Sequence, residues 1–519
     1  ALGMMAIAIA VGYLASKVGA GVGRDLRTKV FNKVVNFSDA EINKFSTASL
    51  ITRTTNDVQQ VQMVTVMLLR MVLYAPIMAV GGIIMVIRTG AGMGYIIAIA
   101  VVAIAVLMIL LMAFAMPKFK IMQKLVDKVN LVSREILTGI PVIRAFSREK
   151  HEEKRFDDAN KELTGVMLYT NRVMTFMMPA LMIIMNVMSI LIVWTSAHRI
   201  DAGVMEVGTM TAFITYTMMI VMAFLMLTMI SIMLPRAGVA ADRIDEVLKT
   251  EVSVNNSTDA VDAGRSKGVV RFNHVSFAYP EAEGKVLDDI DFEASPGTTT
   301  AIIGSTGCGK STLVNLIPRF FDVTEGSITL DGRDIRNITL ESLRENIGYV
   351  PQKGILFSGT IADNIKYGQL VESDEDMLEA AEIAQATEFI EAKPDKYESQ
   401  VAQGGNNVSG GQKQRLSIAR AIARDPMIYI FDDSFSALDF KTDAALRKAL
   451  APKVKDKTVL IVAQRISTVM HAEQIIVLDD GKVAGIGTHK ELMENCEIYR
   501  QIAGSQLSES ELKKSLEVK

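Results

Sequence analysis

Long apolar runs dominate the first half of the chain. A helix needs about 20 predominantly apolar residues to cross a bilayer. Runs that approach or exceed this length cover roughly 68–88, 93–116, 173–197 and 207–234, and a shorter one covers 1–16. Beyond about residue 235 the apolar runs become short and are separated by glycine-rich and polar segments. The pattern therefore predicts membrane-spanning helices first and a domain outside the membrane afterwards.

The apolar run at residues 1–16 has two interpretations. A signal peptide would begin with basic residues and end at a convincing cleavage site, and the run shows neither. We read it instead as the end of a helix that begins upstream. We therefore expect a native chain with six spans, of which this sequence contains five.

Basic residues indicate which side of the membrane each connection faces. Lys and Arg are concentrated in residues 17–33 and 118–155, and the positive-inside rule assigns such segments to the cytoplasm. The short turns near 89–93 and 198–206 then lie outside. This alternation places the second half of the chain in the cytosol. We expect an integral protein of a bacterial plasma membrane, in contact with membrane lipids.

The two cytoplasmic connections, roughly 17–67 and 117–172, are polar and have helical periodicity. Each contains a local break, at Asn43–Ser49 in the first and at Thr138–Pro141 in the second. We expect a short turn helix at each break, placed to touch a cytoplasmic domain. The alternative is that both connections are solvated extensions of the spans.

Composition limits the classes of molecule that the protein is expected to bind. The 519 residues carry a formal net charge of -3, which gives no electrostatic case for nucleic acid. The two cysteines, Cys308 and Cys496, rule out a disulfide framework and suit a reducing cytosol. Fifteen of the 31 methionines lie between Met167 and Met233. They either pack in the ordinary way or line an adaptable cavity for a small amphiphilic substrate.

A glycine-rich loop of fixed spacing follows the apolar run Thr299–Ile303. It reads glycine, four residues, Gly-Lys-Ser, which is the phosphate-binding loop. Its backbone N–H groups and the start of the next helix form an anion site. Lys310 would reach the β- and γ-phosphates, and Ser311 would ligate Mg²⁺. The predicted nucleotide-binding residues of the loop are Gly304, Ser305, Thr306, Gly307, Cys308, Gly309, Lys310, Ser311 and Thr312.

Further motifs follow in a fixed order after Gly268. They are Phe277–Pro280, Val350–Gln352, Val408–Gln412, Met427–Asp433 and Ser436–Asp439. With the phosphate loop they resemble the ATP-binding cassette (ABC) family, and spans followed by a cassette in one chain resemble its exporters. The resemblance implies an all-α transmembrane domain of the six-helix exporter type, followed by an α/β P-loop nucleotide-binding domain. The expected divisions are residues 1–250, a linker at 251–267 and a nucleotide-binding domain at 268–519.

The resemblance also implies roles within the nucleotide site. Tyr279 matches the aromatic residue that stacks on adenine. Gln352 matches the glutamine that contacts Mg²⁺ and the attacking water, and Asp432 matches the carboxylate that organises Mg²⁺. The implied cofactors are ATP and Mg²⁺, with Ser311, Gln352 and Asp432 at the metal.

The resemblance further implies a second subunit. The signature residues are Ser409, Gly410, Gly411 and Gln412, preceded by Val408 where the family usually has leucine. In this family that helix start faces the γ-phosphate held by the other subunit. Asp439 matches the loop that crosses the dimer interface. One chain alone would therefore have no complete site.

Two residues depart from the family pattern. Asp433 stands where the family usually has the glutamate that acts as general base, and Gln464 stands where it usually has histidine. Aspartate is shorter by one methylene, and glutamine cannot carry a positive charge beside the γ-phosphate. The pair resembles the degenerate-site subunit of a bacterial heterodimeric multidrug exporter. Asp433, Gln464 and Gln352 are the predicted catalytic set of a slow ATPase site.

The sequence thus predicts ATP-driven export of amphiphilic or drug-like compounds by one half of a heterodimer. Two alternatives stay open: a homodimeric lipid or peptide exporter, and an ATP-binding regulatory subunit that does not transport. The apolar spans exclude a soluble nucleic-acid ATPase.

Overall fold

The computed structural model describes residues 2–89, 92–280, 282–508, 511–512 and 515. The chain divides into two compact units. The first comprises residues 1–31 and 51–248, and the second comprises residues 32–50 and 249–519. The second unit therefore includes a short segment that the sequence places between two apolar spans.

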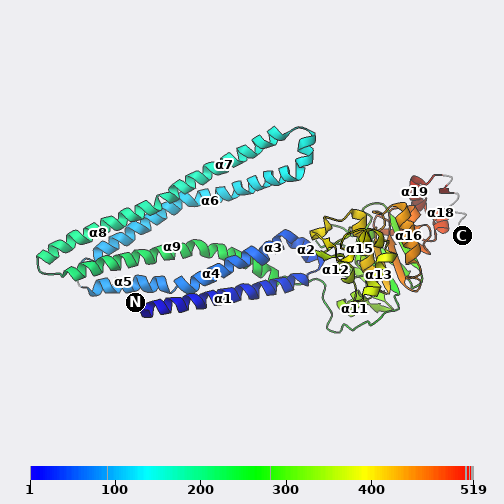
Figure 1. The fold of residues 1–519 in the computed structure, drawn as a ribbon, viewed down its shortest axis with the longest axis horizontal. Coiled ribbons are helices and arrows are strands. Elements are labelled where there is room, and N and C mark those ends of the chain that lie inside the picture. Colours follow the sequence, from blue (N-terminus) through cyan, green and yellow to red (C-terminus); the bar gives the residue numbers. More distant parts are fainter. Residues whose placement is uncertain (1, 90–91, 281, 509–510, 513–514, 516–519) are drawn as a thin grey trace. The chain divides into compact units, whose positions relative to one another are not determined.

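The first unit is a bundle of long helices (Figure 1). They are α1 (Leu2–Val35), α4 (Val58–Met71), α5 (Tyr74–Arg88), α6 (Gly94–Ala145), α7 (Glu149–Thr175), α8 (Met177–Asp201) and α9 (Val207–Lys249). The short helix α3 (Thr47–Thr52) runs from the second unit into the first, and a π-helical turn at Arg53–Asp57 follows it. Within the described residues, five helical segments are long and apolar enough to cross a membrane: Leu2–Val35, Thr47–Arg88, Gly94–Ala145, Glu149–Asp201 and Val207–Leu227. The five predicted spans are confirmed on length and composition.

The bundle is held together by close packing of apolar residues, with a glycine at one close approach between helices. Gly82 of α5 faces α9 so closely that a Cβ there would lie 2.7 Å from Ile220 Cγ1. Because lipid tails compete for apolar surface, close van der Waals packing is what holds membrane helices together, and small residues permit it. Between α6, α8 and α9 the buried side chains are Ile104, Leu181 and Val221.

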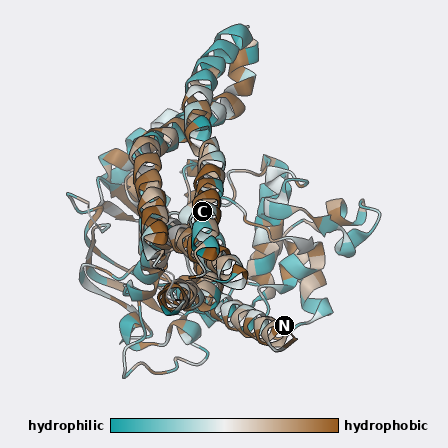
Figure 2. Cartoon of the chain, turned by 90° about the vertical axis from the view of Figure 1, so that its left-hand side faces the viewer, coloured by the Kyte–Doolittle hydropathy of each residue, from teal (hydrophilic) through white to brown (hydrophobic). Residues whose placement is uncertain are grey.

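Helices α6 and α7 form a long hairpin (Figure 1). Figure 2 shows hydrophilic residues gathering toward the end of this hairpin. The break predicted at Thr138–Pro141 is wrong: α6 continues through Pro141 to Ala145, and the turn falls at Phe146–Arg148. Pro141 lacks the N–H that would donate to the Leu137 carbonyl, so α6 gives up one hydrogen bond there and still continues for about one more turn.

The turn helix predicted at the first break is confirmed as α2 (Asp39–Phe45). It ends at Ser46, whose φ of 59° interrupts the helical path before α3. Helix α2 belongs to the second unit, where Ala40 packs against a buried apolar cluster. Glu41 Oε1 accepts a hydrogen bond from the Ser253 N–H at 3.1 Å. The first cytoplasmic turn therefore touches the cytoplasmic domain of its own chain.

The second unit is an α/β domain built on a six-stranded sheet of order β12-β11-β3-β10-β9-β6. The strands are β3 (Thr299–Gly304), β6 (Ile347–Val350), β9 (Ile428–Asp432), β10 (Thr458–Val462), β11 (Gln474–Asp479) and β12 (Lys482–Gly487). All pair in parallel except β12, which is antiparallel to β11. Strands β9 and β10 are buried along their whole length, as expected when both faces of a parallel sheet are covered.

A second, antiparallel sheet has the order β2-β1-β4-β5 and shares an apolar cluster with one face of the main sheet. Its strands are β1 (Val270–Phe277), β2 (Leu287–Ala294), β4 (Glu325–Leu330) and β5 (Arg333–Asp334), and a separate two-stranded pair is β7 (Gly359–Thr360) and β8 (Gln400–Val401). The α-helices of the unit are α10 (Lys310–Asn315), α11 (Leu340–Glu345), α12 (Ile361–Lys366), α13 (Asp374–Ile383), α14 (Thr387–Glu391), α15 (Gly410–Ala423), α16 (Phe440–Leu450), α17 (Ile466–Val469), α18 (His489–Asn495) and α19 (Glu497–Gln506).

Four neighbouring parallel strands end at one edge of the main sheet. Their last residues are Gly304 in β3, Val350 in β6, Asp432 in β9 and Val462 in β10. The phosphate loop, Gln352, Asp433 and Gln464 each follow one of these ends within two residues. Ligands of open parallel sheets bind at the carboxyl ends of the strands. The strand order therefore gathers segments that lie far apart in the sequence.

Candidate nucleotide-binding site

The phosphate loop connects β3 to α10. Gly309 precedes the first residue of α10 with a φ of 97°, in the left-handed region that favours glycine. A Cβ there would also lie 2.8 Å from Leu287 Cδ2. Lys310 is buried, and its ammonium group donates to the carbonyl oxygens of Gly304 at 2.9 Å and Ser305 at 2.6 Å. The lysine charge is thereby held at the loop.

The loop borders a cavity of about 360 Å³. The residues that line it are Tyr279, Val286, Thr306, Gly307, Gly309, Lys310, Ser311, Thr312, Gln352, Asp432, Asp433, Val462 and Gln464. The structure therefore brings together the residues proposed for nucleotide, metal and catalysis. Val286 and Val462 were not predicted as site residues from the sequence. In the pattern of apolar and polar positions, an apolar residue that lines a site looks the same as one in the core.

Asp432 and Ser311 form a hydrogen-bonded pair in this cavity. Ser311 Oγ donates to Asp432 Oδ1 at 2.9 Å. Burial raises the pKa of the Asp432 carboxyl group and the nearby Asp433 adds to the rise, whereas the Ser311 hydrogen bond and the Lys310 charge oppose it. A hard divalent cation prefers such oxygen donors and would offset the cost of burying the carboxylate. The pair therefore fits Mg²⁺.

Asp433 lies between two amide side chains. Its Oδ2 accepts hydrogen bonds from Gln464 Nε2 at 2.9 Å and from Gln352 Nε2 at 3.3 Å. The backbone of Asp433 has a φ of 46°, and its N–H donates to the Val462 carbonyl at 3.0 Å. The three residues predicted as the catalytic set are therefore joined through a single carboxylate oxygen.

Tyr279 stands on the wall of the same cavity. Its hydroxyl lies 2.9 Å from Thr312 Oγ1. Its ring packs edge-on against Phe277 and Phe321, with centroid separations of 4.9 and 5.3 Å. Two aromatic neighbours fix the ring, and the hydroxyl joins it to the phosphate loop.

The predicted signature residues do not line this cavity. Ser409 caps α15: its Oγ accepts from the Gln412 N–H at 3.3 Å, and Gln412 Oε1 accepts from the Ser409 N–H at 3.1 Å. Ser409 and Gly410 are exposed. Asp439, also exposed, caps α16 through the Thr442 N–H at 2.9 Å, and the hydrogen bonds from Thr442 hold its pKa below the usual range. Both helix starts are open at the surface of the chain.

Two glutamines that sequence analysis missed hold the site segments in place. Gln414 of α15 is buried; its Oε1 accepts from the Gly354 N–H at 3.0 Å, and its Nε2 donates to the Pro351 carbonyl at 3.1 Å. Gln506 of α19 donates through Nε2 to the Gln464 carbonyl at 2.8 Å. Each bond joins segments far apart in the chain, and no local pattern marks either residue.

Comparison with known families decides the identity of the chain. Residues 1–224 match the family described as "ABC transporter transmembrane region", and residues 287–436 match "ABC transporter". The chain belongs to the ABC transporter family. This transporter is 44% identical over 508 residues to an ABC transporter ATP-binding protein of Mycobacterium tuberculosis. The aligned region covers 96% of this chain and 86% of that relative.

Two further relatives show which kind of ABC transporter this is. The chain is 32% identical over 493 residues to a putative multidrug export ATP-binding/permease protein of Bacillus subtilis, covering 94% of this chain and 84% of that one. A solved bacterial Atm1-family ABC exporter with ATP bound is similar with a TM-score of 0.78 and 26% identity, covering 95% and 86% of the two chains.

The transporter is an ABC exporter with an ATP-binding domain, and its ATPase activity is coupled to transport. It is an integral protein of the bacterial inner membrane with that domain in the cytoplasm. The predicted fold class, enzyme class and location are confirmed. ABC exporters work as dimers, so the prediction of a second subunit is confirmed at that level.

Proposed function

We propose that this chain exports small amphiphilic, drug-like compounds as one half of a heterodimer, and that its phosphate loop belongs to the slower of two ATP sites. The observation that carries the proposal is the contact between Gln464 Nε2 and Asp433 Oδ2, at 2.9 Å. It joins the two departures from the family pattern within one site. The name of the Bacillus subtilis relative supports drug-like compounds as the cargo.

The geometry of Asp433 supports slow hydrolysis at this site. A general base must come within hydrogen-bond reach of the attacking water. The aspartate is one methylene shorter than glutamate, and its Oδ2 already accepts hydrogen bonds from Gln352 and Gln464. Losing general-base catalysis slows a reaction by about 10²–10⁴-fold, or roughly 3–5 kcal/mol of barrier. Gln464 adds an amide hydrogen bond but no positive charge.

ATP binding does not depend on these two positions. The phosphate loop and the Asp432–Ser311 pair are complete. Ser311, Asp432 and Gln352 would hold Mg²⁺, which when bound neutralises charge on the β- and γ-phosphates. Lys310 would exchange the carbonyls of Gly304 and Ser305 for phosphate oxygens. The site would therefore hold ATP for longer than it hydrolyses it.

Fast turnover would occur at the partner's phosphate loop, which the signature residues of this chain would complete. The residues are Ser409, Gly410, Gly411 and Gln412, with Asp439 beside the interface. The start of α15 is exposed, and the N–H groups of a helix start attract an anion such as the γ-phosphate.

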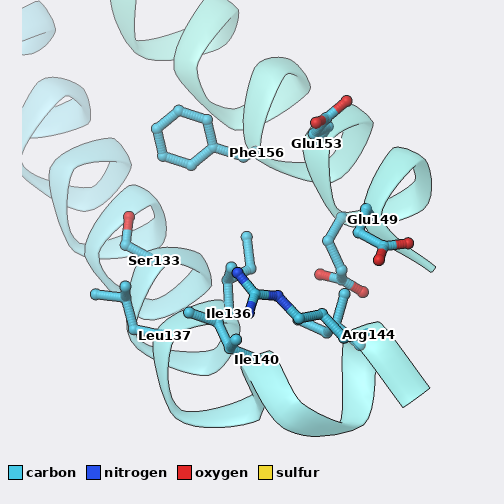
Figure 3. A pocket seen from close by; sticks show the side chains of 10 residues that line it. Ser133, Ile136, Leu137, Ile140, Arg144, Glu149, Glu153 and Phe156 are labelled. Atoms are coloured by element: carbon cyan, nitrogen blue, oxygen red, sulfur yellow. The ribbon is translucent and has the colours of Figure 1, made fainter. Parts of the chain in front are cut away.

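The end of the α6–α7 hairpin supports a second contact between subunits. It contains a largely apolar groove of about 470 Å³ with charged residues at its rim (Figure 3). The groove is lined by Ser133, Ile136, Leu137, Ile140, Ile143, Arg144, Glu149, Glu152, Glu153 and Phe156. In the second unit, the exposed rings of Phe357 and Tyr367 pack 4.8 Å apart. The hairpin of one subunit would dock at this aromatic surface of the other.

Restoring the family residues tests the slow site. In the assembled transporter, with the partner's site silenced by Ser409→Arg, the double variant Asp433→Glu/Gln464→His should raise ATP hydrolysis about tenfold or more, because a general base regains its reach. Asp456→Glu adds the same methylene at an exposed position and should leave the rate unchanged. An unmodified chain that hydrolyses ATP alone as fast as the assembled pair would refute the heterodimer.

Proteoliposomes separate the alternatives. An exporter should accumulate a fluorescent amphiphilic dye on one side when ATP is added, and the dye should stimulate hydrolysis. ATP binding without any accumulation would favour a regulatory subunit. Lipid or peptide transport by the chain alone would favour a homodimeric exporter.

A further inference from the structure

A tight turn follows the phosphate-loop helix α10, and Arg319 is its central residue. Arg319 has a φ of 56° and is only 4% exposed. Its guanidinium forks onto Asp322, from Nε to Oδ1 at 2.6 Å and from Nη2 to Oδ2 at 3.0 Å. Nη2 also donates to the carbonyl of Asn255 at 3.0 Å. Asn255 lies in the segment that leaves α9, so one buried side chain joins that segment to the end of the phosphate-loop helix.

The same turn is fixed to the strand that leads to Gln352. Arg344 of α11 donates through Nε to the Pro318 carbonyl at 3.0 Å and through Nη2 to the Arg319 carbonyl at 3.1 Å. The Phe320 ring packs edge-on against Tyr349 of β6 at 5.5 Å. Tyr349 in turn donates its hydroxyl to Asn315 Oδ1, at the end of α10, at 2.8 Å. A shift of α10 must therefore move the turn.

The segment after α9 is also fixed to the first cytoplasmic turn. Its Ser253 binds both residues of the α2 capping box: its N–H donates to Glu41 Oε1 at 3.1 Å, and its hydroxyl lies 2.8 Å from Ser38 Oγ. Two residues later, Asn255 meets Arg319. Burial lowers the pKa of the Arg344 guanidinium, and the charge of Arg319 lowers it further. The negative charge of Asp39, the first residue of α2, raises it and so stabilises the charged form of Arg344. The contacts are therefore continuous from α2 to α10.

We propose that Arg319 is a positioning residue that transmits the state of the phosphate loop to the segment after α9 and to α2. Both segments continue directly into membrane helices: α2 lies between α1 and α3, and the segment follows α9. Among the described residues, the Nη1 group of Arg319 is buried and has no hydrogen-bond acceptor. It can therefore form a new hydrogen bond when the turn shifts, which allows the guanidinium to have two arrangements. The inference needs only coupled ATP hydrolysis, and it holds for a homodimer or a heterodimer.

Hydrogen–deuterium exchange on the assembled transporter in lipid nanodiscs, with and without ATP and Mg²⁺, tests the proposal. ATP should slow exchange in the phosphate loop, residues 304–312, and change exchange in residues 250–258 and 39–45. In Arg319→Lys the positive charge remains, but the side chain cannot form both the bidentate contact with Asp322 and the hydrogen bond to the Asn255 carbonyl. The phosphate-loop response should persist, while the response at 250–258 shrinks about fivefold or more.

Arg336→Lys is the matched control. Arg336 forms the same fork, onto Asp334 at 3.0 and 2.6 Å, and also reaches a backbone carbonyl, that of Gly326 at 3.3 Å, but it contacts neither Asn255 nor α2. It should retain both responses. The proposal is overturned if residues 250–258 respond normally in Arg319→Lys, if they do not respond to ATP in the unmodified protein, or if the phosphate-loop response is lost together with theirs. An equal loss in Arg336→Lys would also overturn it.

Discussion

The polar side chains of the candidate nucleotide site hydrogen-bond within the site in this structure. Lys310 donates to the loop carbonyls, Ser311 to Asp432, and Gln464 to Asp433. Buried polar groups need partners, so the side chains meet across the cavity. Binding of ATP and Mg²⁺ would exchange the bonds of Lys310 and Ser311 for bonds to phosphate oxygens and to the metal. Affinity therefore depends on how well each new bond compensates for an existing one.

Tyr279 offers a test at the scale of one residue. Tyr279→Phe keeps the ring but loses the hydroxyl contact with Thr312, so ATP affinity should be retained. Tyr279→Ala removes the stacking surface, worth about 1–3 kcal/mol per base, and should weaken ATP binding roughly 5–150-fold. Titration of the purified transporter with ATP measures both. Equal losses in the two variants would show that the hydroxyl, and not the ring, binds the nucleotide.

Among the elements, the C-terminal helices α18 and α19 hold the segment after β10. Gln506 donates to the Gln464 carbonyl, and His489 anchors the helices to each other. His489 is buried; its Nδ1 lies 2.8 Å from the Tyr499 hydroxyl, and its Nε2 lies 3.0 Å from Ser515 Oγ. Burial lowers the pKa of His489, and His471 lowers it further. The native pair of helices therefore favours the neutral imidazole.

This element should lose stability in acid. The pKa of His489 in the folded state lies below its value in the unfolded state, so the unfolded state binds more protons. The free energy of unfolding therefore falls as the pH drops from about 7 toward 5, by at most about 1.4 kcal/mol per pH unit. Hydrogen exchange in α18 and α19 across this range measures it. His489→Gln should flatten the dependence, and His151→Gln, an exposed site on α7, should not. If the pH dependence persists in His489→Gln, a titrating group other than His489 must cause it.

At the scale of the whole molecule, the chain provides two different half-sites. Its own cavity holds the phosphate loop with Asp433 and Gln464, whereas the start of α15, at Ser409 and Gly410, is exposed at the surface. A dimer of two such chains would have two equal sites. A dimer with a partner that keeps glutamate and histidine would have one slow site and one fast one. The two assemblies differ in which mutations stop turnover.

Two variants in the assembled transporter distinguish these assemblies. Ser409→Arg places bulk and charge at the start of α15, so it should lower turnover at the partner's phosphate loop at least about tenfold. In a heterodimer with one slow site, Asp433→Asn removes the carboxylate from that site only, so it should lower total hydrolysis by a much smaller factor. The steady-state ATPase rate measures both. Equal effects of the two variants would indicate a homodimer with equivalent sites.

The sequence by itself determined the spans, the phosphate loop and the departures at Asp433 and Gln464. These features depend on local patterns: a run of apolar residues long enough for a bilayer, and a glycine spacing that few other structures require. The first cytoplasmic turn was predictable for the same reason, because polar residues capable of capping mark its ends. The second was misplaced, because a proline inside a long helix removes one hydrogen bond without ending the helix, as Pro117 and Pro141 of α6 both show.

Only the tertiary structure decided which of these residues meet. The order of strands β3, β10, β9 and β6 brings the phosphate loop, Gln464, Asp433 and Gln352 to one edge, and that order is set by packing across the whole domain. Gln414, Gln506 and Arg319 have no local signal, because each acts on a segment distant in the chain. Hydrogen bonds between distant segments depend on three-dimensional geometry, which a one-dimensional pattern does not contain.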